Sequence, residues 1–368
     1  MKILELIETP SVVIDMERVY KNLKTMSELT AACGCSLRPH IKTHKIPEFA
    51  KLQLKYGASG ITCAKVSEAE VMADAGITDI FVAYPLVGEF RISRAIDLAK
   101  RIRLILGVDS VEGAVMLSKA AQAAGVEFEV RLEIDTGLRR TGIPFDTAEE
   151  ICRAIADIPA IRVSGIYTFR GLILNGGPTT DNRAAGYQEG ELMTGLANRL
   201  RAAGLDIWDV SCGSTPTGRY AAEINGVTEI RPGTYIFQDY MQVCEGSCTM
   251  EECAASVLVT VVSTPSDSYA VVDGGSKTFG TDFPVGVPPY NFKGYGYVKG
   301  NSDLVLSRVN EEHGIITGLS GTTGLKVGQR LLIVPVHVCS TVNLHNHIWL
   351  MEEDKYRKVR VEARGMLV

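Results

Sequence analysis

Short apolar segments alternate with amphipathic helical segments eight times in the first two-thirds of this 368-residue chain. The helical segments carry start signals, such as Ser67 with Glu70 three residues later in the arrangement of a capping box. Such alternation predicts parallel strands joined by helical crossovers, and eight units in about 240 residues match the size of a (β/α)8 barrel. A doubly wound open sheet is the alternative, but no glycine-rich dinucleotide-binding turn follows the first strand. The predicted strands lie in CSLRPHIK, GITCAKV, DIFVAYP, RIRLILGV, FEVRLEID, IRVSGIYTF, DIWDVSCG and VTEIRPG.

The pattern changes at about Ser247. Apolar segments rich in β-branched residues then follow one another, separated by Gly, Pro, Ser and Asn, and helical periodicity is absent. This texture predicts a mostly antiparallel β domain. We therefore expect a barrel domain over residues 1–244 and a β domain over residues 245–368.

The composition excludes several classes of protein. A net charge of -5 gives no reason to expect a nucleic acid or an anionic membrane as a partner. The chain has no apolar run long enough for a transmembrane helix, and its start is too short and too acidic for a signal peptide. The nine cysteines are scattered and odd in number, which favours reduced thiols. These features predict a soluble, cytoplasmic protein.

A basic segment, SLRPHIKTHK, spans the end of the first predicted strand. Strand alternation would place Arg38, His40 and Lys42 on one face, with Lys42 at the C-terminal end of the strand, where barrel active sites form. Lys45 would begin a turn that faces solvent. The alternative is that this segment is exposed at the surface and has no catalytic role. If Lys42 instead points inward, a covalent imine with an aldehyde cofactor is one way to hold it there.

An aldehyde cofactor with a phosphate would need an anchor at the same rim of the barrel. The segment SCGSTPTG, residues 211–218, follows the seventh strand and offers backbone N–H groups and hydroxyls, although such clusters are more often plain turns. The eighth strand is followed by Arg231, Thr234 and Tyr235. The fifth is followed by Asp135, Arg139 and Arg140.

A second candidate cluster lies in the β domain, in VPVHVCSTVNLHNH. His337 and Cys339 are two residues apart, so on a strand both side chains would point the same way. Imidazole with thiolate is a zinc-type ligand pair that leaves positions open for water and substrate. The alternative is a buried cysteine beside an incidental histidine. His345 and His347 could also be ligands, although we favour a structural or surface role for them.

These stretches together resemble the D-serine dehydratase and D-threonine aldolase family, which comprises fold-type III pyridoxal-phosphate enzymes related to alanine racemase. The resemblance covers nearly the whole chain and is carried by TPSVVIDMERVYKN, LRPHIKTHK, EIDTGLRRTG, GSTPT, EIRPGTYIFQD, VDGGSKTFGTD, EEHG and HVCSTVNL. It implies that Lys42 forms the Schiff base with pyridoxal 5'-phosphate. It implies a homodimer, because relatives build the site from two subunits.

The resemblance also implies roles for other residues. Gly213, Ser214, Thr215 and the backbone near Thr234 and Tyr235 would hold the phosphate. Arg140 would lie near the phenolic oxygen of the cofactor, Arg231 would face the pyridine nitrogen, and Tyr167 would contact the cofactor. His337 and Cys339 match the metal-binding pair, with zinc expected and manganese or magnesium as alternatives.

One loop departs from the family pattern. Relatives commonly carry a histidine-containing segment after the sixth strand, whereas this chain has IYTFRGLILNGG, with Phe169 and Arg170 and no histidine. Arg170 could bind an additional anionic group of the substrate, such as a second carboxylate. His40 lies either beneath the cofactor, toward the substrate, or in the barrel packing.

The expected reaction is β-elimination from a D-3-hydroxy amino acid, most simply D-serine, to a 2-oxo acid and ammonia. Lys42 would take the Cα proton, and the metal would act as a Lewis acid on the β-hydroxyl. Retro-aldol cleavage of D-threonine or a similar substrate is the nearest rival, followed by an amino-acid racemase. A pyridoxal-phosphate carrier protein and an unrelated zinc hydrolase are more distant alternatives.

Overall fold

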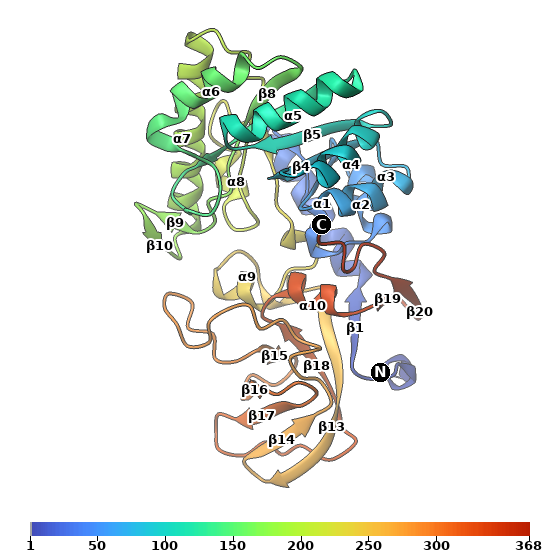
Figure 1. The fold of residues 1–368 in the computed structure, drawn as a ribbon. Helices are drawn as coiled ribbons and strands as arrows, with labels where there is room; N and C mark the ends of the chain where they lie inside the picture. The colour runs from blue at the N-terminus through green and yellow to red at the C-terminus, as the bar shows by residue number, and fades with distance from the viewer. Residues whose placement is uncertain (1) are drawn as a thin grey trace. The chain divides into compact units, whose positions relative to one another are not determined.

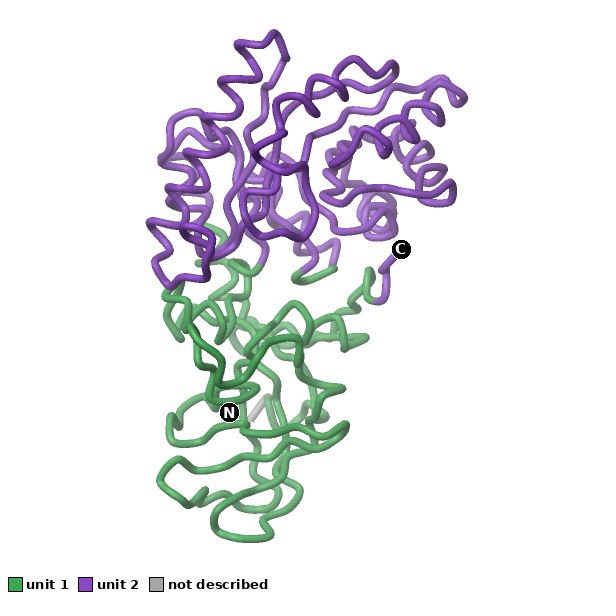
Figure 2. Tube along the Cα trace, turned by 60° about the vertical axis from the view of Figure 1, so that its left-hand side comes forward, with its two compact units in different colours: residues 1–24, 43–45, 234–364 green, residues 25–42, 46–233, 365–368 purple. Residues whose placement is uncertain are grey.

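A computed structural model describes residues 2–368, which form two compact units (Figure 2). The barrel unit comprises residues 25–42, 46–233 and 365–368. The β unit comprises, of the described residues, 2–24, 43–45 and 234–364. No helix among residues 2–368 combines the length and the apolar character needed to cross a membrane.

The barrel unit contains a parallel sheet in the order β2-β12-β11-β8-β6-β5-β4-β3. Strands β4, β5 and β8 of this sheet are labelled in Figure 1. A parallel bridge between His40 and Thr62 joins the two ends of this order, so the eight strands form a ring. All eight predicted strands are present, and the barrel prediction is confirmed. Their bounds are β2 (Ser36–Leu37), β3 (Ile61–Cys63), β4 (Asp79–Pro85), β5 (Arg103–Val108), β6 (Phe128–Asp135), β8 (Ile161–Tyr167), β11 (Asp209–Cys212) and β12 (Glu229–Ile230).

Amphipathic helices connect these strands. Helix α5 shows how local sequence sets the ends, because the Ser110 side chain accepts a hydrogen bond from Gly113 N and Gly125 ends the helix in the left-handed region. The predicted cap at Ser67 is wrong, because α3 begins at Val66 and the Ser67 hydroxyl donates instead to Val368 O. The helices are α1 (Met16–Cys33), α2 (Pro47–Lys55), α3 (Val66–Asp74), α4 (Glu89–Ala99), α5 (Val111–Ala124), α6 (Ala148–Ala156), α7 (Asn182–Ala202) and α8 (Gly218–Ala221). Minor elements are β7 (Ile143–Pro144), β9 (Ile173–Leu174) and β10 (Gly177–Pro178).

The first barrel strand is shorter than predicted. The N–H groups of Ser36, Arg38 and His40 donate to carbonyls 228, 230 and 232 of the neighbouring segment, as in a parallel ladder. The chain then turns into a 3-10 helix, η2 (Ile41–Thr43). Lys42 therefore lies in a turn after the strand, and the prediction that it continues the strand face of Arg38 and His40 is wrong. Lys45, expected to face solvent, is also buried.

Charged residues near the starts of the strands form a buried network at the N-terminal end of the barrel. Glu229 accepts hydrogen bonds from Arg38 Nε at 2.7 Å and from Arg131 Nη1 at 2.5 Å. Arg38 also pairs with Asp79, and Arg131 pairs with Asp209. Five strands are thus linked by ion pairs at the end of the barrel opposite to the one where barrel enzymes place their catalytic residues.

The β unit contains a nine-stranded sheet in the order β14-β17-β16-β15-β18-β13-β1-β19-β20. An additional pairing of β13 with β14 closes six of these strands into a second, antiparallel ring. The predicted antiparallel β domain is therefore confirmed as an architecture. The strands are β1 (Ser11–Asp15), β13 (Ala255–Ser266), β14 (Tyr269–Val272), β15 (Gly296–Val298), β16 (Leu304–Val309), β17 (Gly314–Gly318), β18 (Arg330–Pro335), β19 (His347–Glu352) and β20 (Lys355–Arg360).

The β unit also takes up the beginning of the chain. Strand β1 is antiparallel to β13 and parallel to β19, and Val13 packs with Ile7 and Leu258 in a buried cluster. The residues before Thr25 thus pack with the β unit, although the prediction grouped them with the barrel. Short helices complete this unit: η1 (Lys2–Leu6), η4 (Thr234–Ile236), α9 (Tyr240–Cys244), η5 (Met250–Glu252) and α10 (Val338–Leu344).

Candidate active site

Lys42 stands at the C-terminal end of the barrel strands, beside an aromatic ring. Its Nζ lies 5.4 Å from the centroid of Phe169, and the Arg140 guanidinium lies 5.0 Å from the same ring. The backbone N–H of Lys42 approaches His40 Nδ1 at 3.4 Å. The structure thus brings Lys42 and Arg140, two predicted cofactor residues, to a single aromatic side chain.

Arg231 is buried inside the barrel. It donates from Nη1 to Ser211 Oγ and from Nη2 to Thr168 O, each at 2.5 Å. Its guanidinium also lies 5.2 Å from the ring centroid of Tyr167. These contacts fix its plane, so the side chain is held rigidly in the barrel interior.

Tyr167 lies at the end of β8 and is also buried. Its hydroxyl donates to Glu133 Oε2 at 3.0 Å, and burial raises the pKa of Tyr167 well above its ordinary value. Gly107 makes room for this hydroxyl, because a Cβ at that position would come within 2.3 Å of the Tyr167 oxygen. Tyr167 therefore stays protonated, and its predicted contact with the cofactor remains a prediction.

The loop after β11 forms a tight, buried cradle. Gly213 has a φ of +80°, and a Cβ there would lie 2.7 Å from Gly218 Cα. Ser214 N donates to Thr217 Oγ1 at 3.0 Å, and the two hydroxyls are 2.9 Å apart. Thr215, in the same loop, is half-buried. The loop has the small residues and hydroxyls that the predicted phosphate site requires.

Glu189 of α7 supports this loop from behind. It accepts hydrogen bonds from Gly213 N at 3.2 Å and from Thr217 Oγ1 at 3.0 Å. Burial raises the pKa of Glu189. Glu189 was not predicted as a site residue, although it stands out in the sequence as an acidic residue among the small and apolar residues on the buried face of a long helix.

The predicted metal pair lies in the β unit, but in a helix start rather than on a strand. Strand β18 ends at Pro335, His337 is the N-cap residue of α10, and Cys339 lies in the first turn. The strand prediction for these residues is wrong. Asp239 stabilises the observed turn, since its buried carboxylate accepts from Val338 N at 2.9 Å.

Both members of the pair have polar partners. His337 Nδ1 lies 2.8 Å from Asp282 Oδ2, and Cys339 Sγ lies 3.2 Å from Thr43 Oγ1 and 3.7 Å from Thr234 Oγ1. Burial alone would raise the pKa of Asp282, but the hydrogen bond and charge of His337 lower it to about 2. Sequence analysis did not single out Thr43 or Asp282, although both belong to the segments that carry the family resemblance.

The remaining candidates, Tyr235, His345 and His347, lie in the β unit. Tyr235 is buried in η4 of the β unit. His345 donates to Thr278 O at 3.1 Å, and His347 is exposed on β19, which agrees with the structural and surface roles favoured for them. Within residues 2–368, no group of three or more His, Cys, Asp or Glu side chains is arranged to hold a metal ion.

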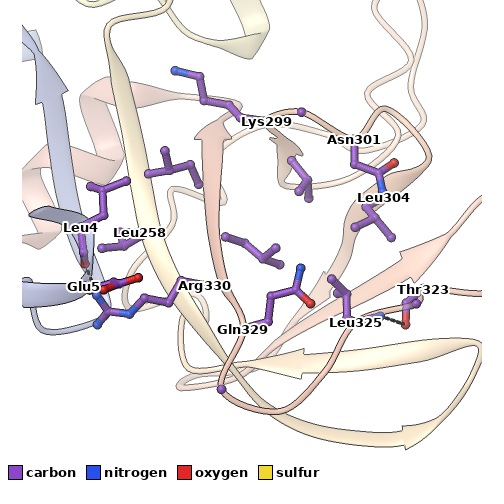
Figure 3. A pocket seen from close by; sticks show the side chains of 16 residues that line it. Leu4, Glu5, Leu258, Lys299, Asn301, Leu304, Thr323, Leu325, Gln329 and Arg330 are labelled. Atoms are coloured by element: carbon purple, nitrogen blue, oxygen red, sulfur yellow. Dashed lines mark hydrogen bonds between the residues drawn. The ribbon is translucent and has the colours of Figure 1, made fainter. Parts of the chain in front are cut away.

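A cavity of about 710 Å³ in the β unit is separate from these residues (Figure 3). Leu4, Leu258 and Leu325 contribute apolar surface, and Gln329 and Arg330 contribute polar groups. None of the predicted site residues lines it.

Known proteins resemble the chain over nearly its full length. Residues 14–241 match the alanine racemase N-terminal domain family, and residues 254–351 match the putative serine dehydratase domain. The chain is 36% identical to the D-threo-3-hydroxyaspartate dehydratase of Delftia sp. over 91% of this chain and 92% of that protein. The chain belongs to the D-serine dehydratase and D-threonine aldolase family.

Other members support this assignment. The 3-hydroxy-D-aspartate aldolase of Paracoccus denitrificans is 32% identical over 98% of this chain and 92% of its own length. The solved D-threonine aldolase of Filomicrobium marinum superimposes with a TM-score of 0.86 at 28% identity, covering 98% of this chain and 97% of that one. These relatives of the family are lyases, both dehydratases and aldolases.

Proposed function

We propose that this protein is a pyridoxal-phosphate- and metal-dependent lyase that eliminates the β-hydroxyl group of a D-3-hydroxy amino acid. The observation that carries the proposal is the contact of Thr43 with Cys339 Sγ at 3.2 Å. Thr43 belongs to the β unit together with Cys339, and it directly follows Lys42 in the sequence. Family membership supports the same class of reaction.

The residues of the barrel unit fit the cofactor. The Gly213 cradle, which a Cβ would fill, offers Ser214 and Thr215 to a phosphate, and Lys42 Nζ is the attachment point beside Arg140 and Phe169. When bound, pyridoxal phosphate supplies an electron sink that acidifies the substrate Cα–H. The Nζ of Lys42 would take that proton. Arg231 can only donate hydrogen bonds. It would therefore disfavour protonation of the pyridine nitrogen of the cofactor if that nitrogen lay against it.

The β unit supplies the ligands for a metal. His337 and Cys339 would hold it, and their imidazole and thiolate favour zinc over manganese or magnesium. Asp282 orients the His337 ring by the hydrogen bond to Nδ1. Bound there, the metal would act as a Lewis acid on the β-hydroxyl, since hydroxide is a poor leaving group. Two solved variants of D-threo-3-hydroxyaspartate dehydratase, with a histidine and a cysteine two positions apart replaced by alanine, support this assignment; the cysteine variant is described as metal-free.

The products of D-serine distinguish elimination from its rivals. We expect pyruvate and ammonia in equal amounts from D-serine, and no glycine. Glycine with acetaldehyde from D-threonine, without any 2-oxo acid, would show an aldolase instead. The relatives include both reaction types on 3-hydroxyaspartate, so D-threo-3-hydroxyaspartate belongs in the same assay.

Metal removal gives a second test. We expect a chelator to abolish turnover while the absorbance of the bound cofactor persists, because the proposed metal and cofactor ligands are different residues. His337→Ala should do the same, whereas His347→Ala, which alters an exposed histidine of the same unit, should leave turnover and metal content unchanged. Full activity in excess chelator would favour a racemase.

We also propose that the enzyme acts as a homodimer in the cytoplasm. The proposal rests on the family resemblance and on the use of cysteine in the sequence. Sedimentation velocity of the holoenzyme tests it, and a single monomeric species at micromolar concentration would contradict it.

A further inference from the structure

The sulfur of Cys339 has a threonine hydroxyl on two sides. Its Sγ lies 3.2 Å from Thr43 Oγ1 and 3.7 Å from Thr234 Oγ1, and both distances are within reach of a hydrogen bond to sulfur. All three residues belong to the β unit. The threonines come from separate 3-10 helices, η2 and η4, which lie far apart in the chain. Two distant segments thus place a hydroxyl against the same sulfur atom.

The burial of Thr43 shows why this contact matters. Its side chain is fully enclosed, with 0% of its surface exposed. A hydroxyl taken out of water without a hydrogen bond costs free energy, so buried hydroxyls are nearly always paired. A neutral thiol is only a weak acceptor, whereas a sulfur that carries negative charge accepts a hydroxyl proton much better. The surroundings of Thr43 therefore suit a sulfur that is charged, as it is when it binds a metal.

Ordinary core packing does not account for this arrangement. A free cysteine that only fills space behaves as a small apolar residue and needs no hydroxyl beside it. Cys339 instead lies two residues after His337, whose Nδ1 has Asp282 Oδ2 at 2.8 Å. Each member of the predicted metal pair thus has polar support of its own, a carboxylate for the imidazole and two hydroxyls for the sulfur.

We propose that Thr43 and Thr234 are positioning residues that donate hydrogen bonds to the Cys339 sulfur and thereby set the affinity of this site for zinc. The inference rests on the proposed function, in which His337 and Cys339 hold the metal. Hydrogen bonds to a ligand orient it and tune the metal, and their loss typically lowers metal affinity by about 10- to 100-fold.

Zinc binding to the metal-stripped holoenzyme tests the inference without measuring turnover. Thr43→Val removes the hydroxyl and keeps the shape of the side chain. We expect it to lower the zinc affinity by about 10- to 100-fold in competition with a chromophoric chelator. Thr43→Ser, which keeps the hydroxyl, should restore most of the affinity. Thr322→Val, at an exposed threonine of the same unit, is the matched control and should bind zinc as the wild type does.

Cobalt(II) in place of zinc reports directly on the sulfur. Its absorption spectrum contains a band for charge transfer from a thiolate ligand, and the energy of that band depends on the hydrogen bonds that the sulfur accepts. We expect Thr43→Val to shift the band and Thr43→Ser to bring it back. Because the contact of Thr234 is longer, Thr234→Val should give a smaller shift and a smaller loss of zinc affinity.

Two results would overturn the inference. In the first, Thr43→Val keeps both the zinc affinity and the cobalt band of the wild type. In the second, Thr43→Ser binds zinc as weakly as Thr43→Val, which would show that the site needs the methyl group rather than the hydroxyl. If Thr43→Val does not fold, Thr234→Val decides in its place, and an unchanged cobalt band in that variant refutes the inference.

These results are separate from the outcome for the proposed reaction. An enzyme that forms pyruvate from D-serine, while its Thr43→Val variant binds zinc as tightly as the wild type, would overturn this inference alone. An enzyme whose Thr43→Val variant loses zinc affinity, but which eliminates no β-hydroxyl, would instead overturn the proposed elimination.

Discussion

Lys42 is the residue on which the proposed reaction depends most, because it would both hold the cofactor and accept the Cα proton. Lys42 could be singled out because a lysine that follows an apolar strand in a barrel pattern reaches the catalytic rim. Its local structure could not be predicted, because the backbone leaves the ladder after His40 and forms a 3-10 turn. Arg38, grouped with it by alternation, belongs instead to the ion-pair network with Glu229.

Replacing Lys42 tests the assignment directly. We expect Lys42→Ala to lose the imine absorbance of the holoenzyme and to lose turnover by several orders of magnitude, because the attachment point and the proton acceptor are removed together. Lys51→Ala, at an exposed position on α2, is the control and should keep both. An unchanged imine band in Lys42→Ala would assign the cofactor to another lysine.

At the scale of elements, the residue types of His337 and Cys339 identified them as a candidate metal pair, but the alternating sequence pattern placed them on a strand. The alternation in VPVHVC is typical of a strand, yet the chain turns into α10 at His337. The turn is fixed by Asp239, which is remote in sequence and which also caps α9 by accepting from Gln242 N at 3.0 Å. A local pattern contains no information about such a distant partner.

Asp239 should therefore stabilise two helix starts at once. We expect Asp239→Ala to lower the free energy of unfolding by about 1–3 kcal/mol, because it leaves two buried N–H groups without acceptors. Urea unfolding measures this, with Glu251→Ala at an exposed position as the control. Equal stability of the two variants would show that α10 starts at His337 without this carboxylate.

At the scale of the whole molecule, eight apolar strands separated by helices were sufficient to predict the barrel. The ion pairs that join its strand starts were not predicted, because their partners come from different strands. Burial alone would raise the pKa of Glu229, but Arg131 and Arg38 lower it to about 2 from an ordinary value of 4.5. Its contribution to stability is therefore complete above pH 4.5 and is lost as the pH falls toward 2.

Glu229→Gln should remove this pH dependence. At neutral pH we expect the free energy of unfolding to fall by about 3–5 kcal/mol, because Arg38 and Arg131 are left buried without their carboxylate. The difference in the free energy of unfolding between this variant and the wild type should shrink as the pH is lowered from 4.5 toward 2. Urea unfolding at each pH measures this difference. Glu127→Gln, at an exposed position on the same unit, should show no such convergence. A constant difference at every pH would mean that Glu229 is not ionised in the folded protein.

The pairing of β1 has a consequence for the order in which the protein is made. Val13 lies opposite Ser256 on one side and Trp349 on the other, so this early strand has no partner until β13 has been synthesised and lacks its second partner until β19 follows. The barrel strands, between Ser36 and Ile230, are complete before either partner of β1 has been synthesised. We therefore expect the barrel strands to be able to pair during synthesis while β1 is still without its partner strands, so that the apolar residues of β1 stay exposed until β13 follows.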